Sequence, residues 1–315
     1  MGMTPFSVAS IKFPAFFFGA HMKKIIAALA ASFCFACASL SAQVIPNKAV
    51  VSNAFDDLGS SFTSALTQVS GMQNIYADAH IGKIFPSLVP HFGGGVNAGV
   101  IRVDTSSLVK IFDELHISAG GVNDTMVLPS VSADIRLGGL FLPFDVGFMF
   151  LKTPSISFSD VSFGFTTFGV DARYAILEDD IAVPGLSIGL GYLYNGIDFD
   201  YSGSGTSVNY NLAVHSVYST LQVSKKVLFV TPFAGARFML SSANMDWKWN
   251  AGTGVFAIGD SGEYSSGFGN FQSQIFAGCG LDFLVFQTTL SVMADFAHLT
   301  DKKFVSGCLS FRAKL

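Results

Sequence analysis

The residues best suited to chemistry are acidic and basic side chains that recur two positions apart. Asp134 and Arg136 are separated by one residue, and so are Asp171 and Arg173. Because successive side chains of a β-strand point to opposite faces, such a pair shares one face, where the two groups can form an ion pair or line a path for solutes. Six further ionisable residues fall on the same predicted faces: Asp78, His80, Arg237, Asp282, Asp295 and Arg312.

Two interpretations of these charges stay open. A charged constriction would select the solutes that pass through a channel. Paired charges would instead fill a narrow interior and hold neighbouring strands in register, because breaking a buried pair leaves an uncompensated charge. For a narrow interior we favour the second interpretation.

Catalytic and metal-binding patterns are weak throughout the chain. The six histidines are scattered, and none begins a His-Glu-x-x-His motif. The Gly-x-Ser-x-Gly turn of many serine hydrolases is absent, and the glycines at 93–95 are not followed by the Lys-Ser/Thr of a phosphate-binding loop. The sequence therefore predicts no enzyme, no cofactor and no metal site, although a serine and a histidine brought together from distant strands are not ruled out.

The composition indicates contact with lipid. Half of the residues are hydrophobic, the mean hydropathy is +0.49, and charged residues make up 13% where about 25% is usual. The chain has 33 Phe, two Trp, a net charge of −4 and no basic run, which argues against a nucleic-acid partner. After the N-terminal region, no stretch approaches the roughly 18 to 20 apolar residues that a membrane helix needs.

The N-terminal region has the pattern of an export signal. Met22-Lys23-Lys24 precedes an apolar run that ends in small residues, which predicts a secretory signal peptide that starts at Met22 and is cleaved after Ala42. Cleavage at 36–38 is an alternative, and Cys37 leaves a lipoprotein signal open. The predicted domains are an upstream extension with the signal peptide (1–42), a helical segment or plug (43–72) and a barrel (73–315).

The charged residues lie in segments that alternate between apolar and polar positions. The last twelve residues, FVSGCLSFRAKL, place Leu309 and Phe311 on one face and Arg312 and Lys314 on the other. A period of two predicts β-strands. We count eleven candidate strands and expect ten to twelve, because single-chain bacterial barrels use even numbers. The candidates lie at 74–83, 91–101, 131–137, 144–150, 168–176, 186–198, 207–224, 228–241, 268–284, 286–296 and 304–315.

The stretches between these strands are rich in turn residues, at 177–185, 201–207, 223–227 and 241–267. Trp247 and Trp249 flank Lys248 in the longest of them, and we expect these two indoles to be interface aromatics or to pack within the loop. Contact of an exposed Trp-Lys-Trp with a partner or ligand is the alternative. Of the four cysteines, Cys279 and Cys308 lie beyond the predicted signal peptide. Their positions in the alternation put them on opposite faces of the sheet, which predicts two free thiols.

Two segments have helical spacing instead. Apolar residues recur every three to four positions between Val51 and Leu66, which predicts an amphipathic helix. It would be a plug inside the lumen, a helix that lies beneath the barrel, or a leader that anchors the first strand. A second such segment, at 108–115, has Thr105 or Ser106 as a candidate N-cap, but it falls within a long connection, where we favour loop structure over a helix.

Together these patterns predict an all-β fold, a transmembrane antiparallel up-and-down β-barrel. The apolar faces are large and rich in Phe, and the opposite faces carry Ser, Thr, Gly and a few charges. A sheet in hydrocarbon must close on itself, because each unsatisfied backbone group costs several kcal/mol. Closure directs the polar faces into the lumen and the apolar faces to lipid.

With its signal peptide, its Phe-rich alternating strands and a final strand that runs to the chain end, residues 74–315 resemble the outer-membrane β-barrels of diderm bacteria. Small hydrophobic-solute channels and other porin-like barrels are the nearest in kind. The resemblance implies insertion in the outer membrane, contact with its lipids, and recognition of the last strand by the barrel-assembly machinery. Members usually end on an aromatic residue, whereas here four residues follow Phe311.

Three functions follow as hypotheses. The first is a channel or transporter for small, including hydrophobic, solutes that needs no cofactor. The second is a surface-exposed structural or adhesive barrel with a closed lumen, whose connections at 103–127 and 241–267 do the work. The third is a lipid-modifying enzyme.

Overall fold

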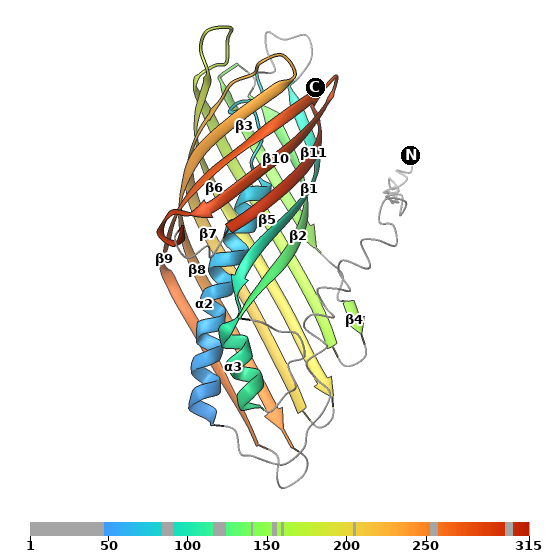
Figure 1. The fold of residues 1–315 in the computed structure, drawn as a ribbon, viewed down its shortest axis with the longest axis vertical. Coiled ribbons are helices and arrows are strands. Elements are labelled where there is room, and N and C mark those ends of the chain that lie inside the picture. Colours follow the sequence, from blue (N-terminus) through green and yellow to red (C-terminus); the bar gives the residue numbers. More distant parts are fainter. Residues whose placement is uncertain are drawn as a thin grey trace, which may run out of the picture.

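The alternating segments form a ring of antiparallel strands in the computed structural model, which describes residues 47–83, 91–115, 124–139, 141–152, 156–158, 161–203, 206–252, 258–299 and 305–314. Strands adjacent in the chain pair with one another, and the pairing of β1 with β11 closes the ring (Figure 1). The predicted up-and-down barrel is confirmed, with ten strands in the described ring. They are β1 (Phe92–Asp104), β2 (Thr125–Gly138), β3 (Phe144–Lys152), β5 (Val161–Leu177), β6 (Gly185–Gly203), β7 (Thr206–Ser224), β8 (Val230–Ala251), β9 (Ile258–Phe283), β10 (Phe286–Asp295) and β11 (Val305–Lys314).

The last strand has the place that the alternation predicted. β11 pairs with β10 on one side and with β1 on the other, where Arg312 lies opposite Gly95. Its backbone groups are therefore used on both sides, and the sheet has no free edge there. A short strand outside the ring, β4 (Ile156–Phe158), pairs with β5.

The two ends of the barrel differ in their connections. At one end, called the turn end, lie the connections at 139–143, 178–184, 225–229 and 284–285, with the start of β1 and the end of β11. At the other end, called the loop end, lie the connections at 105–124, 153–160, 204–205, 252–257 and 296–304. In bacterial outer-membrane barrels short turns face the periplasm and longer loops face the exterior. The loop end is therefore the outer end.

Two helices accompany the strands. The helix α2 (Lys48–Gln73) lies inside the ring, where it contacts β1, β2 and β6 to β11 (Figure 1). The helix α3 (Ser106–Glu114) follows β1 at the loop end, has Thr105 as its N-cap and packs against α2. The expectation of loop structure at 108–115 is therefore wrong, because the apolar residues at helical spacing pack against α2. A short 3₁₀ helix, η2 (Phe296–His298), follows β10. In the part of the chain that the structure describes, no helix is long and apolar enough to cross a membrane.

The outward face of the barrel changes character along the length of β6 to β9. Towards the turn end it carries exposed apolar side chains, among them Ile188, Leu190, Val217, Phe238 and Phe271. Towards the loop end it carries exposed polar ones. These are Asp198, Asp200, Asn209, Asn211, Asn244, Asp246, Lys248, Asn250, Ser261, Glu263 and Ser265.

The inward face changes in the opposite sense. Near the turn end it is mainly polar, with Arg173, Gln222, Arg237 and Gln274 all buried, beside a small apolar cluster that includes Phe233 and Phe276. Near the loop end it is apolar and forms one cluster with α2 and α3. Buried members on the strands are Ile101, Val103, Ile197, Phe199, Tyr201, Tyr210, Leu212, Val214, Ala243, Met245, Trp247 and Trp249.

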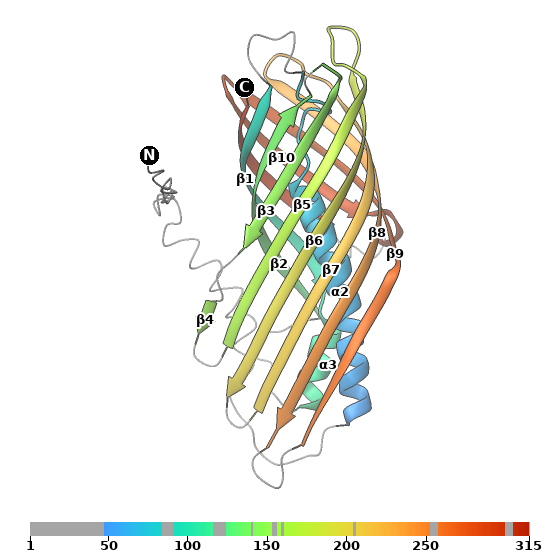
Figure 2. The ribbon, with the colours of Figure 1, turned by 180° about the vertical axis from the view of Figure 1, so that it is seen from behind.

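These two changes divide the barrel into two zones. Apolar outside and polar inside is the pattern of a strand in a bilayer, whereas polar outside and apolar inside is the pattern of a sheet in water. The long strands β6 to β9 therefore cross the membrane near the turn end and project beyond it at the loop end. Figure 2 shows these strands reaching past the other strands of the ring. We call the projecting residues 196–203, 206–214, 243–252 and 258–266, together with α2 and α3, the outer module.

Two expectations about strand position are corrected by the structure. Residues 241–267, read as a turn-rich loop, continue as β8 and β9 up to Ala251 and from Ile258, because their alternation persists with its polarity reversed. Residues 74–83, read as the first strand, lie in the lumen without regular pairing, and the ring begins at Phe92. Cys279 and Cys308 are free and lie on opposite faces, as predicted.

Candidate functional site

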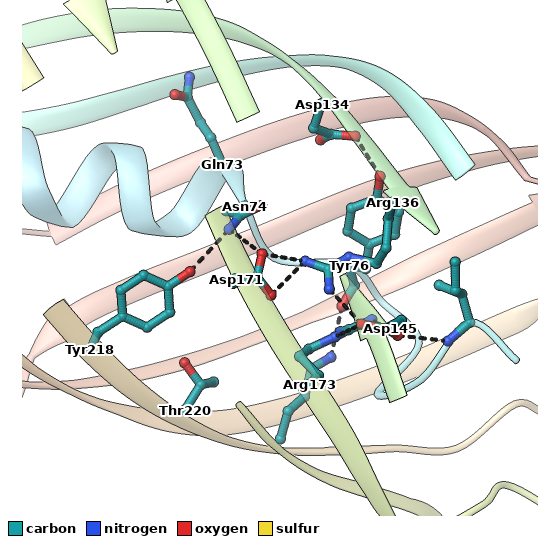
Figure 3. Close-up of polar contacts among 12 residues, drawn as sticks. Gln73, Asn74, Tyr76, Asp134, Arg136, Asp145, Asp171, Arg173, Tyr218 and Thr220 are labelled. Carbon is teal, nitrogen blue, oxygen red and sulfur yellow. Dashed lines mark hydrogen bonds and ion pairs between the residues drawn. The ribbon is translucent and has the colours of Figure 1, made fainter. Parts of the chain in front are cut away.

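The turn half of the lumen is filled by a network of buried ion pairs. Arg136 on β2 lies between two carboxylates, with Nη1 2.5 Å from Asp145 and Nη2 2.8 Å from Asp171. Arg173 on β5 reaches the other oxygen of Asp145 at 2.8 Å. The four side chains are at most 6% exposed, and two positive charges balance two negative charges. Three neighbouring strands, β2, β3 and β5, are thereby tied together through one network (Figure 3).

A second pair lies across the closing strands. Arg312 on β11 contacts Asp134 on β2 at 2.8 Å, and both side chains are at most 1% exposed. Asn97, on the strand between them, donates to Asp134 and accepts from Arg312. This pair crosses from β11 over β1 to β2, so it bridges the seam where the ring closes.

Tyr76 joins the two sets of charges. Its hydroxyl donates to Asp134 at 2.6 Å, and its ring lies 4.0 Å from the guanidinium of Arg312, 4.8 Å from that of Arg136 and 5.9 Å from that of Arg173. A guanidinium within about 6 Å of an aromatic ring is attracted to its face. Tyr76 follows α2 in the chain, so its hydroxyl and its ring fix the lumen segment to the wall.

Further contacts secure the same segment. Asn74 donates to Asp171 at 2.7 Å and to the Tyr218 hydroxyl at 3.0 Å. Gln222 donates to the Tyr76 carbonyl at 2.7 Å. Nearer the turn end, Asp78 binds Lys314 at 2.8 Å. The chain from Asn74 to Asp78 is thus held on several sides of the lumen.

The helix α2 approaches the wall closely where it carries glycine. A side chain at Gly71 would collide with the guanidinium of Arg237, and one at Gly59 would come within 2.7 Å of the Met245 sulfur. Arg237 stacks over the Tyr218 ring at 4.4 Å. Both glycines let the helix lie against the strands with no space between them.

The ten residues expected in the lumen do not form one site. Asp134, Arg136, Asp171, Arg173 and Arg312 gather around Tyr76. Asp282 belongs to a separate group with Lys314 and Lys226 at the turn end. Arg237 lies beside Tyr218, and Asp295 caps η2 by accepting from the Ala297 amide. Asp78 joins the turn-end group through its ion pair with Lys314. His80 is partly buried near Asp145 and Arg173.

Two central residues were missed by sequence reasoning. Asp145 lies two positions before Gly147 in a segment that alternates between apolar and polar residues, so its place on the inner face could have been predicted from the sequence. A side chain at position 147 would collide with the side chains of Arg136 and Asp171, which explains why this residue is a glycine. Tyr76 offered no such signal, because its segment was read as a strand.

The expectation that Trp247 and Trp249 lie at the bilayer interface is corrected by their burial. The indoles are 3% and 0% exposed and point inward, where the Trp247 ring stacks on Phe55 of α2 with 4.8 Å between ring centres. An interface anchor has to face lipid. The exposed apolar surface on the outward face of β6 to β9 is called the apolar belt. Aromatic residues do face outward where this belt meets the outer module. The Tyr192 hydroxyl lies 2.7 Å from His215 Nδ1, and the Tyr194 ring lies 5.2 Å from the same imidazole.

Comparisons with solved structures find barrels from bacterial outer membranes. The outer membrane protease OmpT from Escherichia coli shares 7% identity over 73% of this chain and 99% of its own, with a TM-score of 0.44. The translocator domain of the autotransporter NalP from Neisseria meningitidis shares 10% identity over 84% and 97%, with a TM-score of 0.38. The attachment invasion locus protein Ail of Yersinia pestis shares 10% identity over 70% and 96%, with a TM-score of 0.25.

No family model matches the chain. No curated protein sequence matches it either. At these identities and TM-scores the solved structures bear on no functional statement about this chain. What the barrel does has to be argued from its own lumen and surface.

Proposed function

We propose that this outer-membrane β-barrel is closed by its own N-terminal segment and acts at the cell surface, as a structural or adhesive barrel, through the outer module. One observation carries the proposal: α2 and residues 74–83 occupy the lumen from the loop end to the turn end. A channel for small solutes would need an open path where this segment lies.

The segment is bound too well to leave the lumen readily. Sixteen residues of α2 are buried. In the turn half, Asn74, Tyr76 and Asp78 contact charged groups on the wall. Withdrawing the segment would remove one hydrogen bond each from Asp171 and Asp134 and the Asp78 partner of Lys314. A hydrogen bond to a charged group contributes about 1.5 to 3 kcal/mol, and the buried residues of α2 would be exposed as well. Spontaneous opening is therefore expected to be rare.

The outer module supplies a surface for contact with other molecules. Its exposed face carries more acidic than basic residues, with Asp198, Asp200, Asp246 and Glu263 beside Lys248. Its core is apolar and packed, so the exposed face is held rigidly above the membrane. Such a surface favours binding outside the cell over passage through the wall. The outer-membrane lipids contact the apolar belt below it, and β11 is the element offered to the barrel-assembly machinery.

Planar-bilayer recording of the refolded full-length protein tests the proposal. We expect no resolved openings at either polarity of applied voltage, because the lumen segment stays in place. Insertion is verified separately, by the heat-dependent gel mobility of the folded barrel. Reproducible openings of the intact chain would overturn the proposal and favour the channel that the sequence first suggested.

A further inference from the structure

We infer that the chain enters the barrel from the loop end, so that Asn47 and Lys48, at the start of α2, lie on the outer side of the membrane. The direction of α2 carries this inference, together with the contacts that tie its two ends to opposite ends of the barrel. It goes beyond the proposed function, because it holds whether or not the lumen conducts.

The beginning of α2 is tied to the loop end. The Asn47 amide donates to Glu114 Oε1 at 2.6 Å, and Glu114 is the last residue of α3. Lys48 Nζ donates to the Gly259 carbonyl at 2.8 Å, next to the start of β9. Asn47 and Lys48 are both exposed. The chain therefore passes from solvent into the barrel at this end.

The other end of the segment is tied to the turn end. Lys83 bridges to Gly139, which follows β2, and its Nζ lies 2.7 Å from Glu178, which follows β5. Gly82 has a φ of 112°, a conformation that glycine adopts without strain. A side chain there would also meet the ring of His91 at 2.5 Å. The left-handed residue is therefore placed where the chain leaves the lumen, ahead of β1.

The start of β1 lies beside the end of β11, since Gly93 pairs with Lys314. A chain that approached β1 directly would keep its N-terminal part on that same, periplasmic side. Instead the residues from Val51 to Ile81 traverse the lumen first, in the direction from loop end to turn end. The chain thus crosses the membrane once more than its strands require, and a short peptide attached ahead of Asn47 would be displayed outside the cell.

Epitope accessibility on intact cells tests this inference. One variant of the full chain carries an epitope inserted after Gln43, beyond the predicted cleavage position. Two controls carry the same epitope after Lys226, in a turn-end connection, or after residue 254, in the connection between β8 and β9. We expect antibody binding without permeabilisation for the first and third variants only. Binding of the Gln43 variant only after permeabilisation would overturn the inference.

A smaller change covers the case in which an inserted epitope disturbs folding. Lys48→Cys, in a chain with Cys279→Ser and Cys308→Ser, adds one thiol at the exposed start of α2. A membrane-impermeant maleimide should label it on intact cells, at a rate comparable to that of a control on the exposed face of the outer module, Lys248→Cys. Labelling at the rate of a turn control, Lys226→Cys, would place the start of α2 in the periplasm. Neither outcome depends on conductance, so the inference and the proposed function can fail separately.

Discussion

Deleting residues 48–81 is expected to convert a silent barrel into one that conducts ions persistently. The deletion removes α2 and the lumen segment after it, and it leaves the reversing turn at Gly82 and all ten strands. A helix with its side chains is about 10 to 12 Å across, so its removal vacates a path of that width through the ring. The lumen groups left behind are charged and polar, which favours a water-filled path. Planar-bilayer recording provides the measurement.

A disulfide bond engineered between α2 and β1 would hold the plug in the lumen and leave the fold unchanged. A side chain at Gly99 of β1 would lie 3.0 Å from the Val69 side chain of α2, close enough for a disulfide. The variant Val69→Cys with Gly99→Cys, made with Cys279→Ser and Cys308→Ser, should stay silent when oxidised, as the wild type does. A deletion variant that folds, shown by its heat-dependent mobility, yet never conducts would contradict the assignment of α2 as the plug.

Replacing Asp145 by alanine is expected to destabilise the folded barrel by about 3 to 5 kcal/mol. Asp145 is fully buried and is the carboxylate shared by Arg136 and Arg173. Without it, the network around Tyr76 keeps both guanidinium groups but only Asp171 between them, so one positive charge is left without a partner away from water. Urea unfolding in detergent or lipid measures the change in unfolding free energy. The fraction of folded barrel is followed by its heat-dependent mobility on a gel.

The matched control is an ion pair at the surface. Glu178 contacts Lys83 at 2.7 Å, but the two side chains are 49% and 29% exposed. Exposed pairs contribute about 0 to 1 kcal/mol, so Glu178→Ala should change the unfolding free energy by no more than that. Asp145→Asn keeps the shape and removes the charge, and it should be destabilising as well. Equal effects of the buried and the exposed substitutions would show that the network does not hold the lumen together.

The sequence predicted the ring and the lumen charges because both follow from a period of two. Asp134, Arg136, Asp171 and Arg173 alternate with apolar residues, and the rule that polar side chains face the lumen placed them without any knowledge of pairing. The helix at 48–73 was predicted for the same kind of reason, since its apolar residues recur at helical spacing. Whether it would fill the lumen or only lead into β1 depended on contacts with eight strands, which no local pattern contains.

The same rule failed beyond the membrane. Met245, Trp247 and Trp249 alternate with Asp246 and Lys248 as a strand should, but here the apolar set faces inward. Because the stretch is rich in turn residues, it was interpreted as a loop, and its indoles as interface aromatics or as packed within that loop. Where a strand passes from lipid into water, its apolar side chains turn from the outer face to the inner face of the barrel. The sequence shows the alternation, but it does not show at which residue the strand leaves the bilayer.

The lumen segment at 74–83 was misread for a related reason. Its residues alternate loosely, and Asp78 was rightly expected inside, yet the segment pairs with no strand. Tyr76 gains its role from guanidinium groups on β2, β5 and β11, which lie far apart in the chain. Such a meeting of distant residues follows from the closed ring and not from the segment itself.

Quenching of the intrinsic fluorescence tests the reversal of the two faces most directly, because Trp247 and Trp249 are the two tryptophans of the whole chain. In vesicles of brominated phospholipid, their emission is expected to match that in unbrominated vesicles, since both indoles lie in the core of the outer module. A variant with Tyr192→Trp, at the outward end of the apolar belt, should add emission that the bromines quench. Strong quenching of the unmodified protein would place Trp247 and Trp249 against lipid, and the outer module with its apolar core would not exist.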